Sequence, residues 1–177
     1  MLRLYTHPAC LQHDTGPHHP ESPARLAAVL RVLDRDHYAA LDRVEAPRAT
    51  RDQLLRVHDE AHVQRVLDTV PMGETQWLDD DTALSPGSAE AALRAAGAVV
   101  AAVDAVLSSG HVRRAFCAVR PPGHHATRSE AMGFCLFNNV AVGAAQAMVA
   151  HGLRRVAIAD FDVHHGNGTQ AAFEADD

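Results

Sequence analysis

Two short apolar segments, each followed directly by a polar cluster, constrain the fold of this chain most. The first covers residues 115–119 and leads into Arg-Pro-Pro-Gly-His-His; the second begins at residue 156 and leads into Asp-Phe-Asp-Val-His-His-Gly-Asn. Neither segment shows the apolar spacing of a helix, and both have the length of a buried strand. We therefore predict buried strands over 115–119 and 156–162, with a glycine-rich turn at 166–168 after the second.

Patterns typical of helices alternate with these segments. Residues favoured at helix N-termini precede four of the patterns: Ser22, Thr50, Asp59 and Ser85. An alanine- and valine-rich helix is expected from Pro86 to about residue 107, and another over 138–151, where Gly152 would end it. With a further short strand over 3–7, this alternation predicts an α/β domain with a mostly parallel sheet.

Composition narrows the class of protein. The chain has 177 residues, 47% of them hydrophobic and 21% charged, so we expect one folded domain over 1–177 and no disordered segment. Its formal net charge of -6 argues against direct binding to nucleic acid. The apolar stretch 89–107 is interrupted by charged residues, and the N-terminus lacks the apolar core of a signal peptide, so we expect no membrane contact and a cytoplasmic location.

The basic residues and the cysteines exclude several kinds of chemistry. All sixteen basic residues are arginine, which together with the alanine excess indicates a GC-rich bacterial genome and rules out Schiff-base or P-loop lysine chemistry. The three cysteines are far apart and form no Cys-x-x-Cys motif, so neither a disulfide framework nor a thiolate zinc site is indicated. Cys117 is expected to be a buried thiol.

The polar cluster after the second apolar segment suits a metal ion. Asp160, Asp162 and His164 alternate along the chain, so an extended backbone places them on one face. Two carboxylates following an apolar run would be costly to bury without a cation between them. Asp162 and His164 are a suitable oxygen and nitrogen pair for Zn²⁺, and an open coordination position would make the site hydrolytic.

The cluster after the first segment suits proton transfer. His124 and His125 follow a proline pair and Gly123, which permits close backbone approach. A histidine beside an activated water can act as general base, and its neighbour can carry positive charge that stabilises a tetrahedral intermediate. Each imidazole needs a partner that fixes its tautomer, and Asp160 and Asn167 are available for this.

Three further groups of residues have simpler interpretations. His58 and His62 resemble a zinc-binding helix, but the intervening Glu is out of place, so an exposed or packed pair is expected. Trp77 with the acidic residues 79–81 would suit a cationic substrate, or would form an ordinary solvated turn. Cys135 is expected to be a packing residue.

Five strings in this chain resemble the histone deacetylase and acetylpolyamine amidohydrolase superfamily. They lie at 120–126 (Arg-Pro-Pro-Gly-His-His-Ala), 133–141 (Gly-Phe-Cys-Leu-Phe-Asn-Asn-Val-Ala), 160–170 (Asp-Phe-Asp-Val-His-His-Gly-Asn-Gly-Thr-Gln), 19–23 (His-Pro-Glu-Ser-Pro) and 81–88 (Asp-Thr-Ala-Leu-Ser-Pro-Gly-Ser). The resemblance implies a three-layer arginase/deacetylase-like fold. It also implies Zn²⁺-dependent hydrolysis of an acyl-lysine or acylpolyamine amide.

The same resemblance implies metal and substrate roles for individual residues. Asp162 and His164 match two of three zinc ligands, and Asp160, with the backbone carbonyls of Asp162 and His164, matches part of a structural K⁺ site. Gly133 and Phe134 match the wall of a narrow channel for the acyl-lysine side chain.

It also implies roles in proton transfer. His125 matches the general base and acid, with Asn167 behind it, and His124 matches the electrostatic partner, with Asp160 behind it. The presence of Asn167, where class I enzymes carry Asp, is similar to the class II branch and its bacterial relatives.

The chain resembles only the N-terminal half of that domain. The third zinc ligand and the residue that hydrogen-bonds the developing oxyanion would follow Asp177, so we expect the C-terminal part of the sheet to be missing and this chain alone to have little or no activity. A half sheet would leave a strand edge uncovered, which we expect to be an association site for a homo-oligomer or another partner.

Three other functions remain open at this point. An arginase-type metal ureohydrolase would share the fold, although no second Asp/His motif for a second metal is visible in the sequence. A truncated module that binds without catalysis is another. A Cys-His hydrolase is the third, and would be insensitive to chelators.

Overall fold

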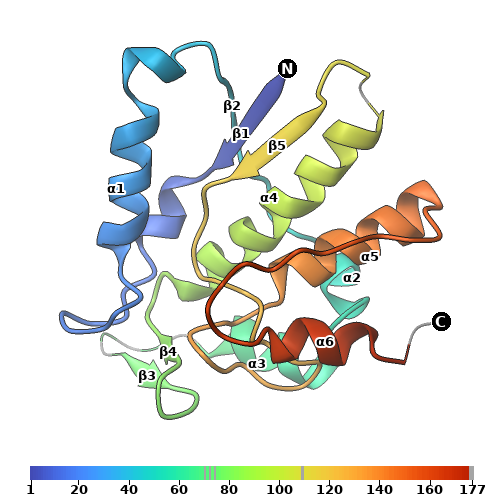
Figure 1. Ribbon diagram of the computed structural model, residues 1–177. Helices are drawn as coiled ribbons and strands as arrows, with labels where there is room; N and C mark the ends of the chain where they lie inside the picture. Colours follow the sequence, from blue (N-terminus) through green and yellow to red (C-terminus); the bar gives the residue numbers. More distant parts are fainter. Residues whose placement is uncertain (70, 72, 74, 109, 176–177) are drawn as a thin grey trace.

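A short parallel sheet organises the molecule. The computed structural model covers residues 1–177 and describes all of them except residues 70, 72, 74, 109, 176 and 177. Strands β1 (Leu2–Thr6), β2 (Asp42–Glu45) and β5 (Arg114–Cys117) pair in the order β2-β1-β5, with both pairs parallel (Figure 1). The predicted strands over 3–7 and 115–119 therefore form, and they are direct neighbours.

The remaining elements are helices and one small hairpin. The helices are α1 (Pro23–Leu33), α2 (Arg51–Leu55), α3 (Glu60–Asp68), α4 (Ser88–Ser108), α5 (Asn139–His151) and α6 (Asn167–Phe173), with 3₁₀ turns η1 (Pro8–Leu11) and η2 (Asp36–Tyr38). Strands β3 (Gln76–Trp77) and β4 (Ala83–Leu84) pair antiparallel.

Local sequence signals explain where several helices begin and end. The Thr50 hydroxyl accepts from Gln53 N while the Gln53 side chain accepts from Thr50 N, a capping box that starts α2. The Asp59 carboxylate accepts from His62 N and starts α3. Gly152, at φ 68°, ends α5 in the left-handed conformation that glycine adopts without penalty.

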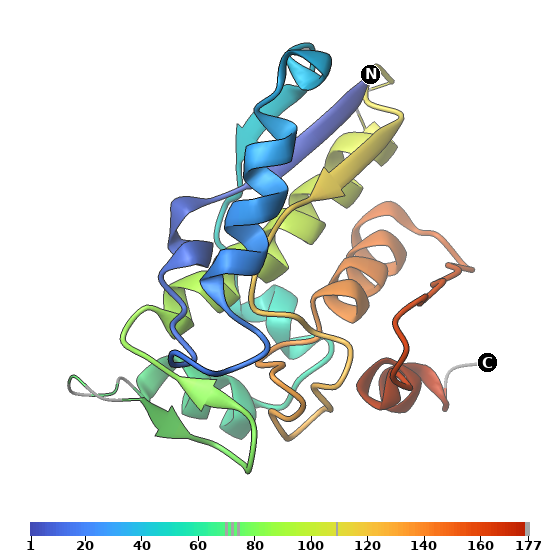
Figure 2. The same cartoon turned by 60° about the vertical axis from the view of Figure 1, so that its left-hand side comes forward.

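Helices cover both faces of the sheet. Side chains alternate along β1, so buried Leu4 packs with Leu26 of α1 while buried Tyr5 packs with Ala98 of α4. The Tyr5 hydroxyl also donates to the carbonyl of Ala101 (3.2 Å). Helix α5 packs against α4 on the side away from the sheet (Figures 1 and 2). The predicted α/β architecture in layers is confirmed.

Small residues let α4 approach its neighbours closely. A Cβ at Gly97 would lie 2.1 Å from the carbonyl oxygen of Pro47, and one at Gly143 of α5 would lie 2.4 Å from the Val99 side chain. Helix α4 is long and apolar enough to cross a membrane by length and composition, yet 44% of its most apolar window is buried inside the molecule. It is therefore the central core helix of this fold.

The predicted strand over 156–162 is wrong. These residues form no strand, and their side chains are largely exposed: Val156 by 40% and Phe161 completely. Figure 2 shows the segment running apart from the sheet, on the side of α5. A strand needs a hydrogen-bonding neighbour, and no described strand pairs with this segment.

Other differences are smaller. Helix α4 begins at Ser88 rather than at Pro86, and the Ser22 side chain makes no capping hydrogen bond although α1 starts where expected. Residues 166–168 open helix α6 instead of forming only a turn. Strand β5 is not fully buried, because Phe116 on one of its faces is 46% exposed.

Candidate active site and metal ligands

A buried ion pair anchors the segment that leads from β5 to the two histidines. The Arg120 guanidinium, 4% exposed, donates from Nε and Nη2 to the two carboxylate oxygens of Glu21, each at 2.5 Å. It also donates to the carbonyls of Cys10 and His13, both at 2.9 Å. One side chain thus ties the end of β5 to the loop before α1, which fixes where the chain departs toward His124.

His125 is held by an amide. Its Nδ1 lies 2.6 Å from Asn167 Oδ1. Because an amide oxygen can only accept, His125 donates from Nδ1, and the lone pair of the neutral ring is then on Nε2. The Asn167 amide is itself oriented, because its Nδ2 donates to the Met132 sulfur at 3.3 Å. This arrangement leaves Nε2 free to accept a proton.

His124 is held by a carboxylate instead. Its Nδ1 donates to Asp160 Oδ2 at 2.8 Å. This hydrogen bond, with a second from Asp162 N, lowers the pKa of the Asp160 carboxyl. The ring centroids of His124 and His125 are 4.0 Å apart. The two adjacent imidazoles therefore have different partners, a neutral amide for His125 and a carboxylate for His124.

Glycines at positions 133 and 166 leave room for the two histidines and their partners. A Cβ at Gly166 would lie 2.7 Å from Asp160 Oδ2 and 3.3 Å from His124 Nδ1. Gly133 has φ +55°, and a Cβ there would lie 2.4 Å from the His125 ring. Any side chain at either position would displace a histidine or its partner.

The predicted metal ligands lie beside the histidine pair. Asp162 Oδ2 accepts from the backbone N–H of His164 and lies 2.9 Å from its Nδ1, and these contacts lower the pKa of the Asp162 carboxyl. His124 Nε2 is 4.0 Å from the same oxygen, and the His164 ring is 6.0 Å from that of His125. The structure thus brings Asp162 and His164, the two predicted zinc ligands, close to His124 and His125.

The chemistry of Asp162 and His164 fits zinc as two ligands. Their 2.9 Å separation is near the spacing of two ligands on one tetrahedral ion, about 3.3 Å for bonds of about 2.0 Å. Both side chains are open to solvent, with exposures of 49% and 70%. In the part of the chain that the structure describes, no group of three or more His, Cys, Asp or Glu is placed to hold a metal. A full ligand set is therefore not assembled by these residues.

A cavity reaches His125 from the surface. It has a volume of about 510 Å³ and is lined by His125, Met132, Gly133, Asn167 and residues 79–81. Of the two residues predicted to form the channel wall, Gly133 lines this cavity together with the acidic residues 79–81, and Phe134 is not among its lining residues.

Phe134 is placed by contacts that the sequence did not reveal. Its N–H donates to Thr82 Oγ1 at 3.1 Å, and the His19 ring packs edge-on against its ring with centroids 4.6 Å apart. Phe134 itself has φ 70°, an uncommon conformation for a non-glycine residue. Phe134 is therefore held by two other loops, through its backbone at Thr82 and through its ring at His19.

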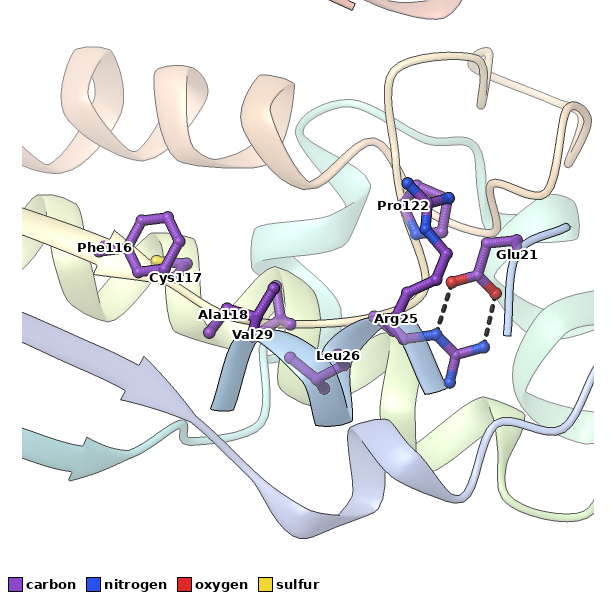
Figure 3. Close-up of a pocket in the computed structure, with 10 residues that line it drawn as sticks. Glu21, Arg25, Leu26, Val29, Phe116, Cys117, Ala118 and Pro122 are labelled. Atoms are coloured by element: carbon purple, nitrogen blue, oxygen red, sulfur yellow. Dashed lines mark hydrogen bonds and ion pairs between the residues drawn. The ribbon is translucent and has the colours of Figure 1, made fainter. Parts of the chain in front are cut away.

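A second cavity lies under the end of β5, between that strand and α1. Figure 3 shows it with Glu21, Arg25, Val29 and Phe116 at its wall, and its volume is about 310 Å³. The Glu21–Arg120 pair closes one end. Sequence analysis missed this pair, although Glu21 and Arg120 belong to two of the strings singled out above; their mutual contact depends on the tertiary fold.

Comparison with known proteins gives consistent matches. The histone deacetylase domain profile matches residues 19–177. A histone deacetylase-like amidohydrolase of Pseudomonas aeruginosa is 40% identical over 182 residues, covering 93% of this chain and 47% of that protein. The human polyamine deacetylase HDAC10 is 43% identical over 162 residues, covering 88% of this chain and 24% of that protein.

A solved structure agrees in fold. The HD domain of HDA15 matches with a TM-score of 0.93 at 37% identity, covering 99% of this chain and 51% of that one. The chain spans about half the length, or less, of the relatives that it matches.

Proposed function

Since this chain belongs to the histone deacetylase family, we propose that it takes part in the zinc-dependent hydrolysis of an amide that joins an acyl group to a lysine or polyamine amine. The observation that carries the proposal is the pair of histidines with unlike partners. His125 is bonded to an amide and His124 to a carboxylate, with the Asp162–His164 donors beside them.

The protein groups have distinct tasks in this proposal. His125, neutral and with its Nε2 lone pair free, takes a proton from the attacking water and later gives it to the leaving amine. Asn167 keeps that ring in the Nδ1–H tautomer. His124 carries positive charge supported by Asp160 and stabilises the negative charge that develops on the substrate oxygen.

Asp162 and His164 would contribute two ligands to the zinc ion. When bound, zinc supplies Lewis-acid activation of the water and of the substrate carbonyl. A K⁺ ion held with the help of Asp160 is part of the same proposal, as implied by the resemblance to the superfamily.

The cavity beside His125 suggests where the substrate would lie. Gly133 lines it, and residues 79–81 place acidic side chains around it. An acyl chain in this cavity would bring its amide to His125, and a cationic polyamine would find complementary charge among those acidic side chains. One relative carries the name polyamine deacetylase, which is consistent with this substrate class.

The chain alone is expected to have little or no activity. The proposal gives zinc two ligands in this chain, Asp162 and His164, and the described residues contain no group of three or more that could hold a metal. The two tyrosines, Tyr5 and Tyr38, lie in β1 and in η2. Loss of a single oxyanion donor costs roughly 10²–10³ in rate.

A chimera tests the proposal. Residues 1–177 would be joined to the remaining half of the Pseudomonas relative and assayed with acetyl-lysine peptides and acetylated polyamines. We expect turnover that a chelator abolishes, that His125→Ala removes, and that His111→Ala, at an exposed position, leaves unchanged. Chelator-insensitive turnover, or hydrolysis of a guanidino substrate instead, would refute it; turnover by residues 1–177 alone at the chimera's rate would refute the expected inactivity.

No observation favours the alternative enzymes. Burial raises the pKa of the Cys135 thiol to about 12, and the thiol donates to the carbonyl of Gly133, so it is a poor nucleophile. An arginase-type centre would need a second group of metal ligands, and the described residues contain none.

A further inference from the structure

Both ends of the loop between His125 and α5 meet at one buried imidazole. His58 is fully buried, at 0% exposure, just before α3. Its Nδ1 lies 2.8 Å from the carbonyl oxygen of Thr127, and its Nε2 lies 2.9 Å from the backbone nitrogen of Asn138. The loop between these two residues carries Gly133 and Phe134, so the ring closes the base of the loop that walls the cavity.

The two backbone partners define the protonation state of His58. A carbonyl oxygen can only accept and a backbone N–H can only donate, so Nδ1 carries the proton and Nε2 does not. A protonated ring would point a second N–H at the N–H of Asn138. Burial, together with nearby His62, lowers the pKa of His58 to about 4, although the backbone of Thr127 and Arg128 and the Asp59 carboxylate act in the opposite direction. The geometry therefore requires a neutral ring in one tautomer.

Asn138, whose backbone is fixed by His58, also contacts the backbone segments that carry His125 and Asn167. Its side-chain Nδ2 donates to the carbonyl of Ala126, the residue after His125, and to Thr169 Oγ1, two residues after Asn167, both at 3.2 Å. Its Oδ1 accepts from Ala141 N and caps α5. The backbone on either side of the proton-transfer pair thus converges on one buried amide.

A second histidine supports the same loop independently. His62 Nε2 donates to the carbonyl of Leu136 at 2.8 Å, so its tautomer is the opposite one. The two imidazole centroids are 5.0 Å apart, and both rings pack against Phe137. The His58 and His62 rings, which the sequence suggested as an exposed or packed pair, thus hold three backbone groups of this loop.

We propose that His58 is a positioning residue for the His125–Asn167 pair, acting through Asn138 as a neutral Nδ1–H imidazole. This inference rests on the proposed function only for the task of His125. Among the described residues, the hydrogen-bond partners of the His58 ring are Thr127 and Asn138, and neither Asp162 nor His164 is one of them. Its effect is on the orientation of the base.

The tautomer of the unaltered protein provides the first test. Long-range proton–nitrogen NMR correlation on ¹⁵N-histidine-labelled chain reports which ring nitrogen carries the proton. We expect His58 to be neutral with the proton on Nδ1 from pH 8 down to pH 6, and His62 to be the Nε2–H form. An Nε2–H tautomer or a cation at His58 in that range overturns the proposal.

Variants provide the second test. His58→Leu removes both hydrogen bonds, His58→Gln keeps one donor and one acceptor, and His111→Leu is the control at an exposed site. The readout is the exchange rate of the His125 Nδ1–H proton, which the bond to Asn167 protects. We expect the His125 proton to exchange about tenfold faster in His58→Leu, because a tenfold change corresponds to about the free energy of one ordinary hydrogen bond. In His58→Gln we expect the exchange rate to return toward that of the unaltered protein.

Amide exchange of β1 and β5 reports whether each variant is folded. Unchanged His125 exchange in folded His58→Leu, or no recovery in folded His58→Gln, overturns the proposal. If His58→Leu does not fold, the proposal is decided by two other results: the His125 exchange rate in His58→Gln compared with the unaltered protein, and the tautomer of His58. None of these readouts involves turnover or metal, so their failure is separable from failure of the proposed hydrolysis.

Discussion

The site is built from two segments that are held in very different ways. Residues 120–127 are buried or half-buried and are anchored by hydrogen bonds, with Arg120 tied to Glu21 and Asn138 tied to Ala126. Residues 156–165 form no helix or strand and have largely exposed side chains, and they contact the histidine pair through Asp160, Asp162 and His164. The two histidines are therefore preorganised by this chain, whereas Asp162 and His164, the proposed zinc ligands, are open to solvent.

The largest effect is expected from acid, which should destabilise the buried surroundings of the first segment, where His13 contacts Arg120 and His58 contacts Thr127. Burial lowers the pKa of His13 to about 3 and that of His58 to about 4, below the ordinary value of 6.5. As the pH falls, both histidines are protonated in the unfolded chain before they are protonated in the folded one. The free energy of unfolding is therefore highest above pH 6.5 and decreases as the pH drops toward 4, by on the order of 3 kcal/mol for each histidine.

Urea denaturation at several pH values measures this loss. His58→Gln removes one titrating group and should flatten the profile between pH 6.5 and pH 4. A profile with no slope in that range would contradict the buried, neutral state of both histidines.

Breaking the anchor of the first segment is expected to be nearly as severe. Arg120→Leu leaves the Glu21 carboxylate buried without its partner, a situation that costs about 3–5 kcal/mol. The matched control is Arg51→Leu, which breaks the exposed pair with Glu60 and should cost at most about 1 kcal/mol. Equal urea midpoints for the two variants would mean that the buried pair does not anchor the segment.

In the second segment a substitution should affect metal binding and not folding. Asp162→Asn removes a carboxylate ligand from an exposed position, so we expect zinc affinity to fall at least about tenfold, as loss of an outer-shell partner already does. Calorimetric titration measures the affinity, and Asp80→Asn is the control. Unchanged zinc affinity in the variant would exclude Asp162 as a ligand.

The smallest stability effect is expected at the most exposed apolar side chain. Phe161 is 100% exposed, so Phe161→Ser should change the free energy of unfolding by less than about 0.5 kcal/mol. The same change should weaken self-association, because it removes apolar surface beside the open β5 edge. Sedimentation velocity over a concentration range checks this, and a large loss of stability would show that Phe161 is packed after all.

Sequence reasoning succeeded where structure is set by local signals. The capping box of Thr50, the Asp59 cap and the Gly152 stop depend on neighbours along the chain, and the helices that they bound form as predicted. The strand expected over 156–162 failed because strand formation depends on a partner elsewhere. Strand β2 and the β3–β4 hairpin escaped notice for the same reason.

The site was predicted in parts. Residue types indicated Asp160 and Asn167 as available partners, the resemblance to the superfamily implied which histidine each of them supports, and the structure brings both pairs together. The roles of Arg120 and His58 could not be predicted from the sequence, because their hydrogen-bond partners lie about 70 to 110 residues away along the chain.

The two glycines beside the histidines set limits on how this cleft could be redesigned. Since a methyl group at position 166 would collide with Asp160 and one at 133 with His125, a randomised library should leave both codons fixed. Variation is better spent at residues 79–81, where the cavity is wide and side chains point to solvent. Under the proposed function, changes in selectivity among amines are thus expected to come from residues 79–81, while His124, His125 and their partners are kept unchanged.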